Sequence, residues 1–416
     1  MNKLNYQLRD YQKEAVEKGV WGLTKYNKPF IIMAATGAGK SLIIADICHK
    51  IDKPILILQP NKEILEQNYD KLLSYDPTIE AGIYSASKGR KEITKFTFAT
   101  IGSIYKKPEK FKDFKYVIID ECHGLDPKNV DGMLTSFLKA IGVTAVCGLT
   151  ATPYRIVQKY YEDEKGLVWY TGHLKMINRI YPFFFKKIVY KIETAELIKQ
   201  GYLSPIDYFV DKTDLSSLKM NKSGTDFTEE SLKRFWNNDR LRRIAQAVEY
   251  SDKHNKKTLI FCSSITQAKN AMSLCKALGL PVDMVDGKTP AKDRERAVMS
   301  FKHGQTKHLF NVGVFTTGFD VPDLNCIILA RPTMSLALYY QMIGRGVRLN
   351  PTKPDKRLTV YDLAGVVNKF GKVEDIRVKT EKGGFKDEVW SIKGRLDEEP
   401  LFKWFVKNKP KFGGKE

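Results

Sequence analysis

The sequence lacks several features that would assign it to a secreted, zinc-stabilised or membrane-spanning class. None of its 6 cysteines forms a C-x-x-C pair, so neither a zinc ribbon nor a dithiol redox motif is supported. Several cysteines lie in apolar runs, as buried free thiols do, and this usage fits a reducing cytoplasm. The first residues have no apolar signal core, and no apolar run is long enough to cross a bilayer. We therefore expect a cytoplasmic protein without a membrane partner.

Acidic residues are in deficit. The chain has 69 Lys and Arg against 48 Asp and Glu, which gives a formal net charge of +21. A polyanionic partner would relieve the self-repulsion of such an excess, and nucleic acid is the partner that we expect. Solubility alone is the alternative explanation of the same charge.

Low-complexity segments and periodic repeats are also missing, and 416 residues are too many for one ordinary hydrophobic core. Two series of short apolar, β-branched runs alternate with helix-like segments. The first series comprises 30–33, 55–58, 96–99, 116–119 and 145–148, and the second comprises 258–261, 282–285, 307–312, 326–329 and 358–361. Because such runs between helices indicate parallel strands buried on both faces, we predict an α/β fold with two tandem doubly wound domains.

The two series also set the expected domain boundaries. The first domain takes 1–155 and the second 231–370, with a connecting region at 156–230 and an appendage of unassigned fold at 371–416. Within the connecting region, residues 177–192 interleave aromatics with Arg and Lys, a pattern that can stack bases and hold phosphates. Core packing of the three phenylalanines at 183–185 is the alternative that we favour, since large aromatics are usually buried.

The run FIIMAATGAGKS carries the first chemical motif. A strand enters the pattern Ala34-x-x-x-x-Gly39-Lys40-Ser41 and a helix follows, which is a phosphate loop with Ala in place of the usual first Gly. In such a loop the backbone N–H groups cradle phosphates, the Lys reaches the β- and γ-phosphates, and the Ser ligates Mg²⁺. A glycine-rich turn with an exposed Lys is the alternative. We assign to ATP the loop residues Ala35, Thr36, Gly37, Ala38, Gly39, Lys40 and Ser41.

The run YVIIDECHGL ends an apolar strand on two acids. Asp120 can hold Mg²⁺ through water, and Glu121 can orient and polarise an attacking water. Acids that merely begin a loop are the alternative, which the phosphate loop eighty residues earlier makes the weaker one. His123 either couples the nucleotide to neighbouring motifs or caps a turn, and the sequence does not separate these roles.

Two shorter motifs in the first half are weaker. In LRDYQ, the Gln12 amide can pair donor and acceptor with an adenine edge, while Arg9 can bond or stack on the base. In LTATP, residues 149–153, two threonines follow another strand. Their hydroxyls can bridge hydrogen bonds between the domains, although a strand-ending turn has the same appearance.

The second half contributes two further motifs. In VGVFTTGFDVPDLN, small polar groups at Thr316, Thr317 and Gly318 suit phosphate or sugar contacts, and Asp320 can orient an arginine or the ribose. In LYYQMIGRGVRLN, three polar residues are spaced i, i+4 and i+7, which predicts one face of a helix. They are Gln341, Arg345 and Arg348, and we expect the glycines at 344 and 346 to clear space around Arg345.

This ordered set of motifs resembles a superfamily 2 helicase or translocase. The resemblance covers about residues 4–365 through LRDYQ, AATGAGKS, QPNKEILEQ, ATIGSI, DECH, LTATP, LIFCSS, TTGFDVP and QMIGRGVR. Within the superfamily the chain is similar to RadD-like and phage-type DNA repair helicases. It departs from the pattern at Ala34, at Cys122 and at Met342, where many relatives carry a basic residue. The cysteine-rich zinc module of some relatives is absent, so its function cannot be transferred.

The resemblance implies a fold of two RecA-like domains with an ATP and Mg²⁺ cleft between them. It assigns Gln12 and Arg9 to adenine, Gly318 and Asp320 to the nucleotide, and Ser41 and Asp120 to Mg²⁺, partly through water. The catalytic set would be Lys40, Asp120, Glu121, Gln341, Arg345 and Arg348. The nucleic-acid path would be lined by Pro60, Asn61, Thr100, Gly102, Ser263, Thr316 and Gly318.

The activity that follows is nucleic-acid-dependent ATP hydrolysis by a monomer that acts on DNA rather than RNA. Strand separation or branch remodelling in replication, recombination or repair is the process that we expect. A duplex translocase that serves as the motor of a restriction-type assembly is one alternative. An ATP-gated nucleic-acid clamp that turns over too slowly to move is another.

Overall fold

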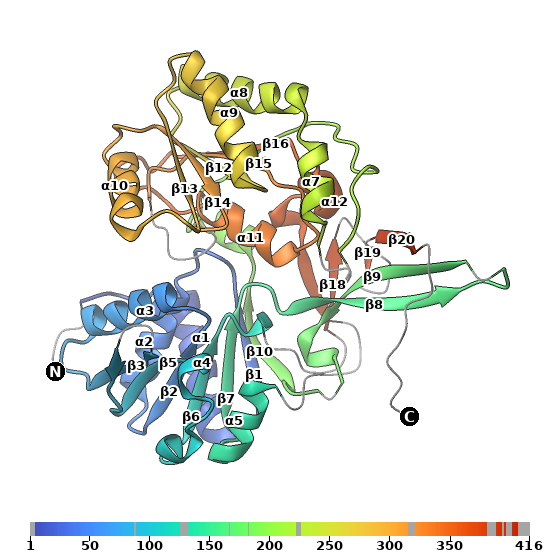
Figure 1. Ribbon diagram of the computed structural model, residues 1–416. Coiled ribbons are helices and arrows are strands. Elements are labelled where there is room, and N and C mark those ends of the chain that lie inside the picture. The colour runs from blue at the N-terminus through green and yellow to red at the C-terminus, as the bar shows by residue number, and fades with distance from the viewer. Residues whose placement is uncertain are drawn as a thin grey trace.

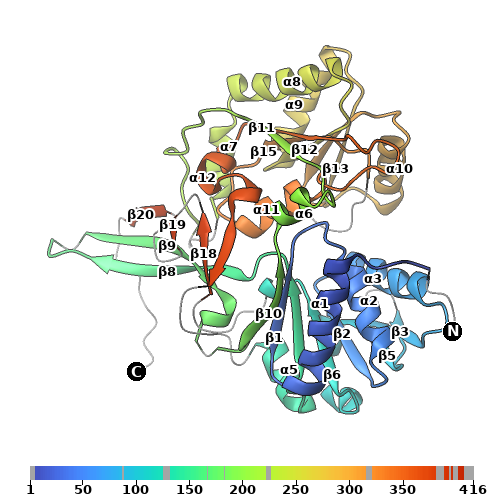
Figure 2. The same cartoon turned by 180° about the vertical axis from the view of Figure 1, so that it is seen from behind.

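The computed structural model describes residues 5–86, 89–124, 132–165, 167–181, 183–221, 226–314, 321–380, 388–392, 395–396 and 402–406. It confirms the predicted α/β class: two domains, each built around a largely parallel sheet with helices on both faces (Figures 1 and 2). The first domain carries the N-terminal half of the chain, and the second lies against its upper edge in the view of Figure 1.

The first sheet has eight strands in the order β10-β1-β7-β6-β2-β5-β3-β4. Five of them are the predicted runs: β1 (Phe30–Ala34), β2 (Ile55–Gln59), β5 (Phe96–Thr100), β6 (Tyr116–Asp120) and β7 (Val146–Thr150). The sequence analysis missed β3 (Ala81–Ser85), β4 (Arg90–Lys91) and β10 (Lys187–Ile192). The helical elements of this domain are α1 (Asp10–Trp21), η1 (Gly22–Tyr26), α2 (Lys40–Lys50), α3 (Lys62–Tyr75), α4 (Ile101–Ile104), η3 (Pro108–Phe111), η4 (Cys122–Gly124) and α5 (Met133–Ile141).

The second sheet has six strands in the order β11-β16-β15-β12-β14-β13, all parallel in the pairs that the structure describes. The predicted runs form β12 (Thr258–Cys262), β13 (Val282–Asp286), β14 (His308–Val312), β15 (Cys326–Ala330) and β16 (Leu358–Asp362), and β11 (Ile206–Val210) adds an edge strand. The helices are α7 (Glu229–Phe235), α8 (Asn238–Lys253), α9 (Ile265–Ala277), α10 (Ala291–Lys302), α11 (Leu336–Gly344) and α12 (Val366–Phe370).

The connecting region is more than a link between the domains. Strand β10 pairs in parallel with β1 of the first sheet, and β11 pairs in parallel with β16 of the second. Short helices η5 (Ile177–Arg179) and α6 (Thr194–Lys199) flank β10. Of the three phenylalanines at 183–185, Phe185 is fully buried, Phe184 packs against the core and Phe183 is exposed, so core packing accounts for two of them.

A long antiparallel hairpin leaves the first domain directly after β7. Its strands are β8 (Tyr154–Glu162) and β9 (Val168–Met176), and it extends away from both domains (Figures 1 and 2). A strand near the C-terminus, β20 (Phe402–Val406), pairs antiparallel with β9. The C-terminal segment also forms η6 (Val373–Asp375) and a small sheet of β17 (Arg377–Thr380), β18 (Glu388–Ile392) and β19 (Arg395–Leu396).

The segment after the second domain returns to the first. Glu193, just after β10, accepts hydrogen bonds from the backbone N–H of Val378 (2.6 Å) and from the guanidinium of Arg377 (3.3 Å). This contact therefore links the two domains in addition to the connecting region.

Two findings bear on the sequence-level exclusions. All six cysteines are buried and carry free thiols. Among the described residues, the helices are too short or too polar to span a bilayer.

Candidate active site

A cavity of about 270 Å³ lies between the two domains. The first domain contributes its phosphate loop, the acids at the end of β6, and part of α2 and α3, while the second domain contributes polar side chains from α11 and the segment after it. The lining residues are Thr36, Gly37, Gly39, Lys40, Ser41, Leu42, Ile64, Gln67, Asn68, Lys71, Asp120, Glu121, Gln341, Arg345 and Arg348. The structure thus brings together predicted residues that lie up to about three hundred positions apart in the chain.

The phosphate loop leads from buried strand β1 to the start of α2. Gly37 (φ +88°) and Gly39 (φ +80°) adopt left-handed backbone conformations that a side chain would strain, and Gly39 is the N-cap of the helix. The first N–H groups of α2 have no carbonyl partners within the helix and present partial positive charge at this end. The Lys40 ammonium lies 3.4 Å from a Glu121 carboxylate oxygen. The loop is therefore shaped and charged for an anion.

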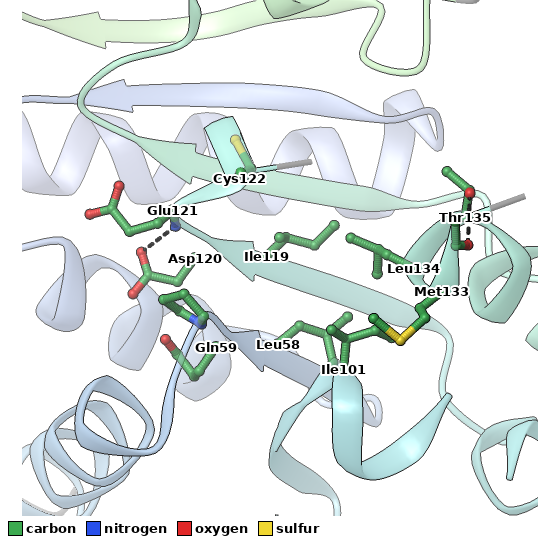
Figure 3. Close-up of a pocket in the computed structure, with 13 residues that line it drawn as sticks. Leu58, Gln59, Ile101, Ile119, Asp120, Glu121, Cys122, Met133, Leu134 and Thr135 are labelled. Atoms are coloured by element: carbon green, nitrogen blue, oxygen red, sulfur yellow. Dashed lines mark hydrogen bonds between the residues drawn. The ribbon is translucent and has the colours of Figure 1, made fainter. Parts of the chain in front are cut away.

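The two acids point in different directions from adjacent positions (Figure 3). Glu121 has φ +49°, which is unusual for a residue with a side chain, and its N–H donates to an Asp120 carboxylate oxygen at 2.9 Å. This turn separates the two carboxylates, so that each takes its own partners. Backbone strain at such a position is typical of functional sites.

The surroundings shift the pKa values of the two acids in opposite directions. Burial, and then the charge of Glu121, raises the pKa of Asp120 above its usual range. Burial alone would also raise the pKa of Glu121, but the Lys40 charge and a hydrogen bond from His123 outweigh it and hold that pKa below its usual range. Glu121 therefore stays ionised at neutral pH, as a group that polarises water must.

His123 connects the acidic motif to the LTATP motif. Its Nδ1 lies 3.2 Å from a Glu121 carboxylate oxygen and 2.9 Å from the Thr150 hydroxyl. The Thr150 hydroxyl also accepts a hydrogen bond from the backbone N–H of Thr152 at 3.0 Å. Of the two roles that the sequence left open for His123, these contacts favour coupling between motifs.

Asn68 is a site residue that sequence analysis missed. It lies on α3 and is buried, and its side-chain amide donates to Asp120 at 2.8 Å and to Gln59 at 3.1 Å. The signal was available in the sequence: α3 buries Ile64, Leu65 and Leu72, and Asn68 falls on the same face at i+4. A polar residue within an apolar stripe needs a polar partner, and that partner is the acid at the end of β6.

Gln12 and Arg9 lie at the start of α1, against the phosphate loop. The Gln12 amide donates to the Ala38 carbonyl at 2.9 Å and accepts from the Arg9 backbone N–H at 3.0 Å. The Gln12 side chain also fills the space beside Gly39, where a Cβ would lie 2.5 Å from its nitrogen. The Arg9 guanidinium stacks over the ring of Tyr202, 4.6 Å from its centroid.

The second-domain residues reach the cavity by a different route from the predicted one. Helix α11 ends at Gly344, with Arg345 as its C-cap, so the expectation of a single helix face through 341–348 was wrong. Arg348 lies beyond the helix and forms a backbone bridge with Leu203. Gln341, Arg345 and Arg348 nevertheless line the same cavity. The helix stops early because the chain must turn toward that bridge.

The two glycines in this segment have roles besides the expected one. A Cβ on Gly344 would lie 2.1 Å from the Thr36 side chain of the phosphate loop, and a Cβ on Gly346 would lie 2.4 Å from Leu358 in β16. The glycines therefore clear space for the opposite domain and for the sheet. That they also clear space around Arg345, their shared neighbour in the chain, stays a prediction. Gly344 sets how closely the two domains approach.

Comparison with known proteins gives the same assignment for both halves. Residues 5–155 match the family described as type III restriction enzyme, res subunit, and residues 239–350 match the helicase conserved C-terminal domain. The putative ATP-dependent helicase IRC3 of Saccharomyces cerevisiae is 26% identical over 367 residues, which cover 83% of this chain and 50% of that protein. The chain belongs to the superfamily 2 helicases and translocases.

Two further relatives extend the comparison. The DNA 3'-5' translocase XPB2 of Sulfurisphaera tokodaii is 25% identical, with 86% of this chain and 81% of that protein covered. The structure of a fragment of a putative HsdR subunit of a type I restriction enzyme from Vibrio vulnificus has a TM-score of 0.64 at 20% identity, covering 89% of this chain and 67% of that one. This chain covers 50% of the length of the yeast relative.

A divalent metal ion, which helicase families use with ATP, fits the residues present. Ser41 and Asp120 line the same cavity and offer a hydroxyl and a carboxylate, the hard oxygen donors that this ion prefers. The raised pKa of Asp120 shows that its burial and the Glu121 charge outweigh the charge of Lys40, so a further cation would be stabilised there. Ser41 and Asp120 are thus the residues that would hold the ion.

A second cavity, of about 390 Å³, is lined by one of the residues expected on the nucleic-acid path (Figure 3). Pro60 and Ile101 line it at the carboxyl ends of the neighbouring strands β2 and β5, and Asp120 and Glu121 line it too. The acidic pair is therefore shared between the nucleotide cavity and this one. Contact with nucleic acid remains a prediction for these positions.

The other expected path residues have protein contacts of their own. The Asn61 side chain caps α3 by accepting from the Ile64 N–H at 2.9 Å, and the Thr100 hydroxyl lies 2.9 Å from that of Ser103, beside exposed Gly102. In the second domain, the Ser263 hydroxyl accepts from the Trp236 indole at 3.2 Å. Thr316, Thr317, Gly318 and Asp320 lie outside the described residues.

Proposed function

We propose that this protein hydrolyses ATP in order to move along nucleic acid, with DNA as its substrate, and that it separates strands or remodels branches in DNA repair or recombination. One observation carries the proposal. Arg345 and Arg348 of the second domain line the same cavity as Lys40 and Glu121 of the first. A cleft that is complete only when two domains meet makes hydrolysis depend on domain closure.

The residues on the first-domain side divide the work. The loop N–H groups and Lys40 bind the phosphates, while Glu121, held ionised by Lys40 and His123, accepts a hydrogen bond from the attacking water. Magnesium bound by Ser41 and Asp120 would neutralise phosphate charge. The separation of roles between the two acids follows from the turn at Glu121, which keeps their carboxylates apart.

The residues on the second-domain side act only when the cleft is closed. Arg345 and Arg348 stabilise the charge that develops on the γ-phosphate, and that attraction favours the closed arrangement. After hydrolysis and phosphate release the attraction falls and the domains part. A polynucleotide held by both domains is then stepped along one domain at a time.

DNA is favoured over RNA by some of the relatives. One relative is named as a DNA translocase, another likeness is to a restriction-enzyme subunit, and the first domain matches a restriction-enzyme family. The net charge of +21 suits any polyanion, so it supports nucleic acid without choosing between the two. The choice of DNA therefore rests on the relatives.

The second candidate function is ATP-driven movement along DNA without separation of its strands. The restriction-type likenesses favour a translocase that travels on duplex DNA within a larger assembly. The two candidates differ in their products: a helicase releases a labelled strand from a fork, whereas a duplex translocase displaces a bound triplex-forming strand and leaves the duplex paired. Running both assays on the same preparation separates them.

The decisive experiment measures ATP turnover with and without matched single-stranded DNA, duplex DNA and RNA. Stimulation by DNA, its loss in Lys40→Ala with unchanged thermal unfolding, and affinity that falls steeply with salt are the expected results. In Glu121→Gln we expect retained ATP binding, no turnover and tight DNA binding in ATP. Equal turnover with and without every polynucleotide would refute the motor function, and slow turnover with no movement would point to an ATP-gated clamp.

A further inference from the structure

Three consecutive residues in the connecting region contact the LRDYQ motif, the phosphate loop and the segment that carries Arg348. Tyr202, Leu203 and Ser204, which we name the connecting strap, follow α6 and precede β11, so they lie where the chain passes from the first domain to the second. The backbone N–H groups of Tyr202 and Leu203 both donate to the Leu197 carbonyl, at 2.8 and 3.2 Å. The strap is therefore anchored to α6 at its first-domain end.

Tyr202 lies at the end of the site expected to hold the base. The Arg9 guanidinium covers its ring and also donates to its backbone carbonyl at 3.4 Å. The Tyr11 ring lies 5.2 Å from the Tyr202 ring, between centroids, and the Tyr11 hydroxyl donates to the Ala38 carbonyl of the phosphate loop at 3.0 Å. Tyr202 is thus packed against the LRDYQ motif, although it comes from outside the first-domain core.

Leu203 and Ser204 hold the backbone that carries Arg348. The Ser204 N–H donates to the Val347 carbonyl at 2.8 Å, and its hydroxyl donates to the Arg348 carbonyl at 3.2 Å. Leu203 forms the backbone bridge with Arg348, and its side chain fills the space beside Gly37, 2.9 Å from where a Cβ would lie. Both residues are almost completely buried, at 2% and 0% exposure.

We propose that the connecting strap is a positioning element that makes the placement of Arg348 depend on whether the base site is filled. Three residues span at most about 11 Å, and two of the three are buried and hydrogen-bonded, so the strap has little slack. Tyr202 is only half-buried, which leaves its ring as the part that a bound base can reach. A base resting on the Arg9–Tyr202 pair would fix that ring, and the strap would then hold Arg348 at the phosphates.

As a consequence, the identity of the base should affect the turnover rate more than it affects the affinity for the nucleotide. A nucleotide whose base does not settle against Tyr202 would still bind through the phosphate loop, which needs no second-domain residue. It would turn over slowly because Arg348 is not held in place. This inference rests on the proposed ATP-hydrolysing function.

The test compares Tyr202→Ala with Tyr202→Phe at saturating DNA. We expect Tyr202→Ala to lower kcat for ATP by about tenfold or more while KM changes by less than about threefold, since coupling between sites is typically 5- to 150-fold. Tyr202→Phe keeps the ring that contacts Arg9 and Tyr11 and should retain wild-type kcat. The ratio of kcat for ATP to kcat for GTP should move toward one in Tyr202→Ala only.

A second variant tests the other end of the strap and does not depend on how well Tyr202→Ala folds. Ser204→Ala removes one hydrogen bond to the Arg348 carbonyl, and its kcat should fall with ATP affinity unchanged. The double variant should lose less than the product of the two single losses, because both act through the same segment. Thermal unfolding of each variant serves as the control for a merely structural effect.

The outcomes separate the strap from the proposed function. A wild-type protein without DNA-stimulated turnover would refute the proposed function, and the strap inference would fall with it. A wild-type protein that turns over normally, with wild-type kcat in Tyr202→Ala, would refute the strap alone. A raised KM with unchanged kcat in that variant would also refute it, because Tyr202 would then be a simple base contact.

Discussion

Asn68 donates a hydrogen bond to the carboxylate of Asp120 at 2.8 Å, and the same amide nitrogen donates to Gln59 at 3.1 Å. Gln59 ends β2, immediately before the Pro60 segment of the expected nucleic-acid path. A single buried side chain therefore ties the acid of the nucleotide cavity to the strand that leads to that path. This hydrogen bond places Asn68 to orient Asp120.

Replacing Asn68 tests this relationship. We expect Asn68→Ala to lower DNA-stimulated turnover by about 10- to 100-fold and to weaken the affinity for Mg²⁺ at fixed ATP, as loss of a partner of a metal-binding residue commonly does. The measurement is turnover as a function of Mg²⁺ concentration, together with Mg²⁺-dependent nucleotide binding. Asp70→Ala, an exposed change on the same helix, is the matched control. Wild-type Mg²⁺ dependence in Asn68→Ala would contradict the role.

The opposite pKa shifts of the acids predict opposite effects on stability. Burial and the charge of Glu121 raise the pKa of Asp120. The protonated Asp120 is therefore favoured in the folded state. Its contribution to the free energy of unfolding is lost as pH rises from about 4, the usual carboxyl range, through the raised pKa. At pH 7–8, without nucleotide or metal, the free energy of unfolding of Asp120→Asn should therefore exceed that of wild type by on the order of 1 kcal/mol or more. The variant should accordingly unfold at a higher temperature.

Glu121→Gln is the matched control with the reverse sign. The pKa of Glu121 is lowered by Lys40 and His123 against the effect of burial, so its charge stabilises the fold above the usual Glu range and that stability is lost as pH falls through the lowered pKa. The neutral variant should be less stable than wild type at pH 7–8. Thermal unfolding of the three proteins between pH 4 and 8 checks both signs, and a stabilised Glu121→Gln would refute this account of the acids.

The arginines of the second domain should affect turnover and spare binding. We expect Arg345→Ala and Arg348→Ala to bind ATP within about tenfold of wild type, or about 1.4 kcal/mol, because the phosphate loop lies in the first domain. Loss of an arginine finger costs on the order of 10³–10⁵ in turnover, so DNA-stimulated hydrolysis and unwinding should nearly vanish.

The control for this experiment is an arginine that lies away from the cleft. Arg357, exposed and paired with Asp207, is that control, and Arg357→Ala should keep both affinity and turnover. Nucleotide titration and stimulated turnover are measured on all three variants. Near-normal turnover in both Arg345→Ala and Arg348→Ala would mean that the segment after α11 is no catalytic surface.

Substitution of Gly344 should give a variant that binds nucleotide but cannot close the cleft between the domains. A Cβ at this position would lie 2.1 Å from the Thr36 side chain, so Gly344→Ala should push the domains apart and lower turnover at least about tenfold with ATP affinity little changed. Thr36→Gly removes the opposing atoms. Adding Gly344→Ala to Thr36→Gly should therefore lower turnover by less than Gly344→Ala lowers it in the wild-type protein. Absence of any recovery would show that Gly344 acts within its own helix.

The strands were predictable wherever burial on both faces left a plain apolar run. All ten predicted runs became strands. Nine of them lie between two other strands, where a parallel strand has mostly apolar neighbours, and the tenth, β13, is an edge strand of the second sheet. Strands β10 and β11 lie at sheet edges and carry alternating or polar residues, so their sequences do not differ clearly from loops. Their positions depend on pairing with distant strands, which no local pattern records.

The site was predictable where one motif supplies the chemistry and unpredictable where two segments meet. The phosphate loop, the acids and the arginines line one cavity, as the motifs indicated. The early end of α11 is set by the bridge between Arg348 and Leu203, 145 positions away, and the role of Gly344 is set by Thr36. Helix periodicity contains no information about either partner.

The edge strands also determine where this protein can be divided. A fragment ending at residue 155, where the first family match stops, would lack β10 and leave the fully buried, apolar strand β1 with an open hydrogen-bonding edge. Such an edge invites aggregation by strand pairing between copies. The second match, 239–350, likewise lacks β11 and β16 and would expose β15. A cut between Ile192 and Ile206 spares both main sheets. The strap lies within this segment, so two halves divided there would keep their sheets and yet lose the covalent link across the cleft.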